Sequence, residues 1–165
     1  MPGLAEQDDQ FGAALVAGRF NDDAFWDVAV GAPGEKVGGD AGAGAVIILF
    51  GSAAGLSGAG ARLLTQGNPE PGDGYGFSLD EGQIVGDGEL VVGAPGETVG
   101  GRLGAGAVSV VKNDDSGFLA VGSQLFYQGA AGVPGAAEAG DGFGSAVAVG
   151  GFGENAGGLA VGVPG

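Results

Sequence analysis

Short apolar segments alternate along the chain with clusters of glycine, proline, asparagine and aspartate. The apolar segments are rich in Val, Ile, Leu and Ala, as in Asp27–Val30 and Ala45–Phe50. Short segments of this composition, bounded by turn residues, are typical of β-strands. No segment keeps the spacing of an amphipathic helix. The pattern therefore predicts an all-β protein.

The predicted strands are grouped along the chain. They fall at Ala13–Val16, Asp27–Val30, Ala45–Phe50, Ala61–Thr65, Gly76–Leu79, Glu89–Val92, Ala107–Val111, Ser123–Tyr127, Ala146–Val149 and Leu159–Val161. The first two groups hold four strands each, and the third group holds two. Four short antiparallel strands in a unit of roughly 60 residues are the pattern of a β-propeller blade.

Internal repeats support this grouping. The segments 31–35, 42–46 and 63–67 return at 93–97, 104–108 and 125–129, each 62 residues later. The aromatic–glycine pairs Phe11-Gly12, Tyr75-Gly76 and Phe143-Gly144 each open a unit. The sequence thus predicts one segment, 1–165, with repeat 1 at about 8–71, repeat 2 at about 72–139 and half of repeat 3 at about 140–165.

The glycine content, taken alone, would indicate a low-complexity chain. Glycine occupies 41 of the 165 positions and proline 7, a content found in low-complexity chains. Hydrophobic residues nevertheless make up 44% of the chain, whereas disordered chains have low hydrophobicity. The glycines are therefore expected to punctuate a packed structure.

Charge and missing residue types exclude several functions. The chain has no cysteine and no histidine, which excludes disulfides, thiolate nucleophiles and a Ser-His-Asp triad. Twenty acidic and 5 basic residues give a net charge of −15, so a nucleic-acid partner is not expected. The longest apolar run, Ala45–Phe50, is far shorter than the roughly 20 residues of a membrane helix, so no membrane insertion is expected. No residue set has a recognisable catalytic pattern, and we predict that the protein is not an enzyme.

An aromatic–glycine pair, a polar loop, an apolar strand and then Gly-Ala-Pro, repeated in register, resemble the FG-GAP repeats of the integrin α-subunit β-propeller and of many secreted bacterial proteins. The resemblance covers the chain from about Asp8 to Gly165. It implies blades of four antiparallel strands in an integrin α-like propeller, whose ring one chain leaves incomplete. It also implies that the loop between the first two strands of a blade can bind calcium.

The family's calcium pattern is Asp-x-Asp/Asn-x-Asp-Gly-x-x-Asp. In the first repeat it maps four residues onto ligand positions: Asn21, Asp23, Asp27 and, through its carbonyl, Phe25. Arg19 replaces the first carboxylate and Ala24 replaces the turn glycine. Calcium takes six to eight oxygen ligands. Two interpretations therefore stay open: a Ca²⁺ site, or an Arg19 guanidinium that stands in for the ion and pairs with Asp23 or Asp27. We favour the second.

The corresponding loops of the other repeats depart further from the pattern. In the second repeat only Glu89, directly before a strand, aligns with a ligand position. In the third repeat the loop 151–158 has lost the final carboxylate. Trp26, the only tryptophan, lies beside Phe25 in the first loop. This aromatic pair fits two interpretations: a binding hot spot, or a side-chain pair that plugs the blade edge or forms an interface with a neighbouring repeat. We favour the second.

Two and a half repeats are too few for a closed ring, which has typically four to eight blades. The chain is expected to complete the ring as a homo-oligomer or within a longer parent chain. The leading hypothesis is a non-catalytic binding or adhesion scaffold whose protein or glycan ligand binds loops at one face. The alternatives are an accessory propeller of a secreted carbohydrate- or lipid-active enzyme and a purely structural module. The resemblance implies secretion or cell-surface display, although residues 1–9 lack a signal-peptide pattern.

Overall fold

The computed structural model describes residues 6–21, 23–84, 88–114, 117–118, 123–153 and 156–165. These residues form antiparallel β-sheets and contain no helix, which confirms the prediction of an all-β protein. Within the same residues there is accordingly no helix long and apolar enough to cross a membrane.

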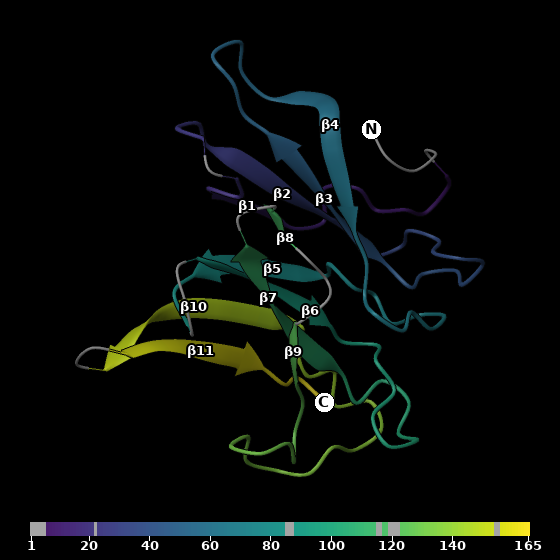
Figure 1. Ribbon diagram of the computed structural model, residues 1–165. Coiled ribbons are helices and arrows are strands. Elements are labelled where there is room, and N and C mark those ends of the chain that lie inside the picture. The colour runs from purple at the N-terminus through teal and green to yellow at the C-terminus, as the bar shows by residue number, and fades with distance from the viewer. Residues whose placement is uncertain (1–5, 22, 85–87, 115–116, 119–122, 154–155) are drawn as a thin grey trace.

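The strands form three sheets, one for each predicted repeat (Figure 1). The first sheet has the order β1 (Leu15–Gly18), β2 (Asp27–Ala32), β3 (Ala45–Phe50) and β4 (Ser57–Leu64). The second has the order β5 (Ser78–Gly82), β6 (Glu89–Ala94) and β7 (Ala107–Asp114), and β7 also pairs with the short strands β8 (Gly117–Phe118) and β9 (Gln124–Phe126). The third consists of β10 (Ala146–Gly153) and β11 (Ala156–Gly162).

The first strand of each full sheet begins two residues later than the sequence predicted. The prediction placed the aromatic–glycine region at the start of the strand, at residues 13 and 76, whereas β1 and β5 begin at Leu15 and Ser78. Gly76 has a φ of +93°, and the Phe77 N–H donates to the Gly74 carbonyl at 3.0 Å, which closes a turn. Because glycine alone adopts this backbone conformation easily, the opening pair forms a turn and the strand starts after it.

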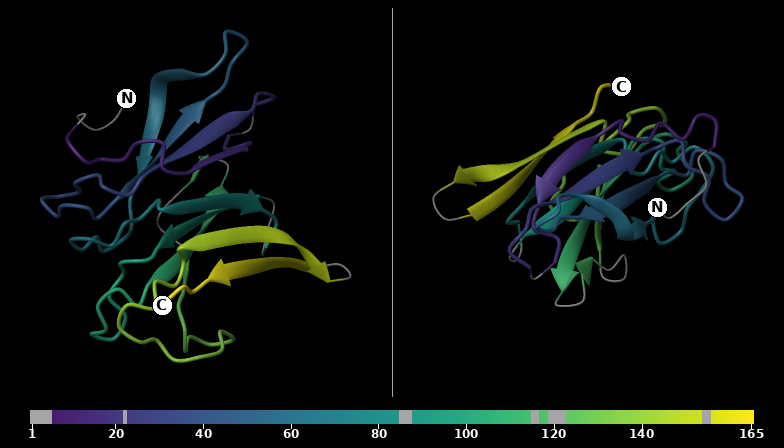
Figure 2. Two further views of the ribbon diagram at one scale, coloured as in Figure 1. Left: turned by 180° about the vertical axis from the view of Figure 1, so that it is seen from behind. Right: turned by 90° about the horizontal axis from the view of Figure 1, so that it is seen from above.

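The three sheets stack face to face, and side chains between them form two cores (Figure 2). The first core joins Ala29, Val46, Ile48 and Leu64 of the first sheet to Leu79, Leu90, Val92 and Val111 of the second. The second core joins Val91, Val108 and Val110 of the second sheet to Val147, Val149, Leu159 and Val161 of the third. Successive residues of a strand point to opposite faces, so the apolar run of β6 is buried on both sides.

Consecutive sheets approach each other most closely at glycines. A Cβ atom on Gly31 would overlap the carbonyl oxygen of Gly76, and one on Gly93 would overlap that of Gly144. The Gly76 N–H in turn donates to the Gly93 carbonyl at 3.1 Å. The glycine of each Gly-Ala-Pro segment therefore lies directly against the opening glycine of the next repeat.

A second set of backbone contacts ties each repeat to the next. Gly74 and Tyr75 donate to the carbonyls of Gly42 and Ala43 at 2.9 and 3.0 Å. The same bonds, with the same lengths, join the second repeat to the third through Gly142, Phe143, Gly104 and Ala105. The recurring Gly-Ala-Gly segments thus supply main-chain acceptors for the neighbouring repeat.

We predict that Gly31→Ala destabilises the protein by about 1–3 kcal/mol, because the added methyl group would force the first two sheets apart. Gly67→Ala is the matched control, since a Cβ atom there meets nothing within 4 Å. It should change stability by less than about 0.5 kcal/mol. Urea unfolding followed by circular dichroism measures both variants, and equal midpoints would contradict the close contact.

Candidate functional site

The described residues of the loops that join the first and second strands of the first two sheets lie at one end of the stack, on the left in Figure 1. In an antiparallel sheet, successive connections alternate between the two ends, so the loops between second and third strands lie at the other end. The first group includes all four residues predicted as calcium ligands. This end of the stack is therefore the candidate binding region.

Asp27 is fully buried at the start of β2 and binds the backbone with both carboxylate oxygens. Its Oδ2 accepts the Phe20 N–H and its Oδ1 accepts the Gly51 N–H, each at 2.8 Å. The carboxylate thus joins the β1–β2 loop to the end of β3, 24 residues further along the chain. Charge-assisted bonds of this kind hold a loop firmly in place.

Asn21 and Asp23 form a local turn. The Asn21 Oδ1 accepts the Asp23 N–H at 3.1 Å, and the Asn21 amide donates to the Asp23 Oδ2 at 3.0 Å. The Asp23 Oδ1 accepts the Phe25 N–H at 2.7 Å. Asn and Asp side chains commonly stabilise turns in this way. Asn21 and Asp23 are therefore hydrogen-bonded to each other, whereas the Asp27 carboxylate binds the backbone N–H groups of Phe20 and Gly51.

Across the described part of the chain, no group of three or more Asp, Glu, His or Cys side chains could hold a metal ion. Arg19 lies over the ring of Trp26, with its guanidinium carbon 5.9 Å from the ring centroid. This is a cation–π distance. Among the described residues Arg19 thus contacts Trp26, whereas its two expected partners, Asp23 and Asp27, accept backbone N–H groups with their carboxylates.

The aromatic pair of this loop is exposed in the single chain. Trp26 keeps 60% of its surface accessible and Phe25 keeps 41%. Trp26 lines a groove of about 490 Å³ between the first and second repeats, which we call the loop groove. Its walls are formed by Arg19, Trp26, Glu81, Gly82, Gln83 and Gly88.

The loop groove offers an aromatic ring, a cation, a carboxylate and an amide side by side. Partial burial raises the pKa of Glu81, and the neighbouring Asp80 carboxylate raises it further. Asp80 also accepts the Val149 N–H at 2.7 Å, which ties this strand to the third sheet. The strand that carries Glu81 is therefore held in place by the third sheet.

The second repeat reproduces the buried carboxylate of the first. Glu89, at the start of β6, is buried and accepts the Ile84 N–H with its Oε2 at 2.8 Å. Glu89 and Asp27, which align in the sequence, thus each accept a backbone N–H from the loop that precedes their strand. Six residues of these loops lie outside the described residues: Asp22, Val85, Gly86, Asp87, Glu154 and Asn155.

Sequence reasoning missed a turn that precedes each opening pair. Asp9, Asp73 and Asp141 each accept the N–H of a glutamate three residues earlier. These donors are Glu6, Glu70 and Glu138, at 2.6, 2.6 and 2.7 Å. The spacing Glu-x-x-Asp before an aromatic–glycine pair recurs in all three repeats and could have identified this turn.

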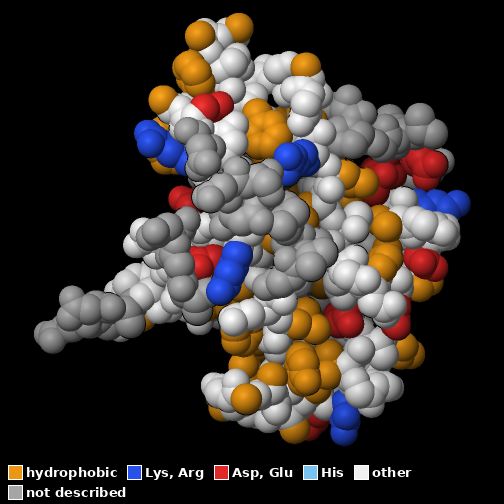
Figure 3. Space-filling view, viewed as in Figure 1, with side chains coloured by type: hydrophobic (Ala, Val, Ile, Leu, Met, Phe, Trp, Pro, Cys, Tyr) orange, Lys and Arg blue, Asp and Glu red, His pale blue; other side chains and the backbone are white. Residues whose placement is uncertain are grey.

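This turn places carboxylates together at the end of the stack away from the loop groove. Acidic side chains gather along the right-hand edge of Figure 3, where these loops lie. Burial raises the pKa of Glu97, and the nearby Asp73 and Glu70 carboxylates raise it further, while a hydrogen bond from Gln66 acts in the opposite direction. Burial raises the pKa of Asp73 as well.

No family model matches the chain, and no curated protein is similar to it at a significant level.

We predict that Asp27→Ala destabilises the protein by about 1–3 kcal/mol, because it leaves the N–H groups of Phe20 and Gly51 without their acceptor. Asp23→Ala, in the same loop but exposed, should cost less than about 1 kcal/mol. Thermal unfolding in millimolar calcium and in chelator tests the metal at the same time. A higher melting temperature with calcium would support a bound ion and would contradict the metal-free interpretation.

Stability should also increase from pH 7 to pH 5. A carboxyl group whose folded pKa lies above its unfolded value binds its proton more tightly in the folded state, so its contribution to stability decreases as the pH rises through the folded pKa. Glu97→Gln should reduce this pH dependence and raise the stability at pH 7, whereas the exposed Glu138→Gln should leave the dependence unchanged. Urea unfolding at pH 7 and pH 5 measures the free energy of unfolding of both variants. The same change with pH in the two variants would contradict the prediction.

Proposed function

We propose that this chain is a segment of an FG-GAP-type β-propeller that acts as a non-catalytic binding scaffold. The proposal follows from the resemblance of its repeats, and the stacking of the four-stranded first sheet on the five-stranded antiparallel second sheet supports it. In a scaffold of this kind, loops carry the ligand contacts while the sheets hold them in place. The remaining blades would come from further copies of the chain or from a longer parent chain, in a secreted or cell-surface setting.

The loop groove is the proposed ligand site, and the exposed Trp26 is the observation that carries the proposal. A large aromatic side chain at the surface loses little conformational entropy on binding and offers a wide contact area. Asp27 holds the β1–β2 loop to the backbone at two points, so the loop needs little reorganisation to bind.

The walls of the loop groove favour a neutral glycan as ligand. The ring of Trp26 can stack on the apolar face of a sugar, while Arg19, Glu81 and Gln83 can exchange hydrogen bonds with its hydroxyl groups. The net charge of −15 disfavours anionic ligands through long-range repulsion. A neutral glycan can form these hydrogen bonds and is not repelled by the net charge. A protein ligand is the alternative, and the experiment below distinguishes the two.

A glycan array followed by fluorescence titration tests this proposal. Because Trp26 is the only tryptophan, a ligand in the loop groove should change the intrinsic fluorescence directly. Trp26→Ala should weaken binding at least tenfold in calorimetry. Leu103→Ala is the control, since Leu103 is also a large exposed hydrophobic residue but lies in a loop at the other end of the stack. Glycan binding that Trp26→Ala leaves intact, or binding to protein ligands alone, would overturn the assignment.

A further inference from the structure

A polar cavity of about 230 Å³ lies between the first two repeats, and we call it the inter-repeat pocket. Its walls come from the segment after β4, the loop after β6, and the strands β7 and β9. It shares no lining residue with the loop groove. The polar side chains in its walls include those of Thr65, Gln66, Tyr75, Glu97 and Ser109.

The inter-repeat pocket contains a buried hydrogen-bond acceptor. The amide nitrogen of Gln66 donates to the Glu97 Oε2. The amide oxygen of the same side chain, Oε1, is buried and accepts no hydrogen bond from the described residues. Buried polar atoms in native proteins are nearly always hydrogen-bonded, because an unmade bond costs free energy. A ligand that donates to Oε1 would therefore be stabilised in this pocket.

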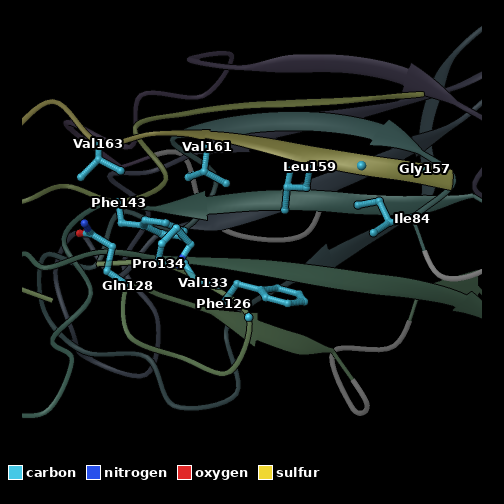
Figure 4. A pocket seen from close by; sticks show the side chains of 12 residues that line it. Ile84, Phe126, Gln128, Val133, Pro134, Phe143, Gly157, Leu159, Val161 and Val163 are labelled. Atoms are coloured by element: carbon cyan, nitrogen blue, oxygen red, sulfur yellow. The ribbon is translucent and has the colours of Figure 1, made fainter. Parts of the chain in front are cut away.

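The equivalent glutamine of the second repeat provides an internal comparison. Gln128, 62 residues after Gln66, also has a buried Oε1 that accepts no hydrogen bond from the described residues. It lies in an apolar groove of about 570 Å³ between the second and third sheets, with Phe143 and Val163 in the wall (Figure 4). Gln128 has the only polar side chain among the described residues that line this groove. The inter-repeat pocket differs because it adds a carboxylate and hydroxyl groups to the same acceptor.

The electrostatic environment of the inter-repeat pocket favours a cation. Burial raises the pKa of Glu97, and the nearby Asp73 and Glu70 carboxylates raise it further. No lysine or arginine is among the described residues that line the pocket. Burial also raises the pKa of Tyr75, so its phenol is neutral at pH 7. A cation in the pocket would therefore be attracted by the carboxylates and would meet no positive charge in these walls.

An ammonium group fits these walls better than a metal ion. Calcium takes six to eight oxygen ligands, whereas Glu97 has the only carboxylate among the described lining residues. An ammonium group has three N–H donors and no acceptor, so it matches walls that are rich in acceptors. Leu125 adds apolar surface for a short aliphatic chain. The pocket is also several times larger than the roughly 30 Å³ that a water molecule occupies in the liquid.

We infer that the inter-repeat pocket binds a small primary amine, whose ammonium group donates to the Gln66 Oε1 and to the Glu97 carboxylate. The hydroxyl groups of the walls, such as that of Thr65, offer acceptors for the third N–H. The aliphatic part of the amine packs against Leu125. Because Gln66 and Glu97 belong to different repeats, the bound amine also strengthens the contact between the first two sheets.

Calorimetric titration of the full chain with n-butylamine tests this inference, in phosphate buffer at pH 8, where the amine is protonated. We expect saturable binding at one site per chain and a higher melting temperature. 1-Butanol has the same aliphatic chain without the charge, and tetramethylammonium has the charge without an N–H donor. Neither should bind measurably. Binding of either compound as tightly as n-butylamine, or no saturable binding of n-butylamine, would overturn the inference.

Two matched pairs of variants locate the amine. Glu97→Gln should weaken n-butylamine binding by roughly tenfold to a hundredfold, because a hydrogen bond between charged groups is lost. Glu138→Gln removes the same charge from an exposed position and should change the affinity by less than about twofold. Gln66→Leu should weaken binding, whereas Gln128→Leu, the same change in the apolar groove, should not. Equal effects within either pair would overturn the site.

The Glu97→Gln variant also separates binding from stability. We expect it to be more stable than the parent chain at pH 7, since the raised pKa of Glu97 shows that the folded state disfavours its charge. A loss of amine affinity in this variant would therefore not result from unfolding. A folded Glu97→Gln variant that keeps the full affinity would overturn the assignment.

Two further titrations identify the source of the ammonium group and its location. Nα-acetyl-lysine methylamide carries the same group on a peptide unit. If it binds about tenfold more tightly than n-butylamine, the ligand is the lysine side chain of a polypeptide, and the assignment to a small amine is overturned. Trp26→Ala should leave amine binding unchanged, because Trp26 lies in the loop groove. Loss of amine binding in that variant would overturn the site, and the glycan proposal can fail independently.

Discussion

The structure depends on the close approach of backbone to backbone where one sheet meets the next. Gly31 lies against Gly76, and Gly93 lies against Gly144, with no room for a side chain at either contact. This approach brings the Gly-Ala-Gly carbonyls within hydrogen-bond distance of the next repeat and lets the apolar faces of the strands interlock. The glycines at these contacts are therefore a requirement of the stacking, because any larger residue at these points would separate the sheets.

Buried carboxylates connect this stack to its loops. Asp27 and Glu89 stand at the starts of equivalent strands and accept N–H groups from the loops that precede them. The residues that the calcium pattern singled out thus serve the backbone, and the Asp27 contact positions the loop that exposes Trp26. A proposed glycan site and the stability of the fold consequently rest on the same carboxylate.

The two ends and the open side of the stack differ in chemistry. One end offers the aromatic and polar loop groove, while the other collects carboxylates such as Asp73 and Glu97, whose burial raises their pKa. The open side is apolar and runs along the edge of β11. Such a distribution suits a scaffold that binds a polar ligand through the loops at one of its ends.

Much of this architecture could be predicted from the sequence, since strand periodicity and turn residues are local signals. The repeats, the all-β class and the equivalence of Glu89 with Asp27 were all accessible in this way. The strand bounds were less accurate: turns at glycines such as Gly76 delay the first strands, β4 begins earlier than predicted, β10 and β11 are longer, and β8 was not predicted. The partners of Asp27, the exposure of Trp26 and the apolar groove beside β11 depend on which distant segments meet, as when Gly51 donates to Asp27. No local pattern encodes these contacts, because they arise only when separate strands pack against one another.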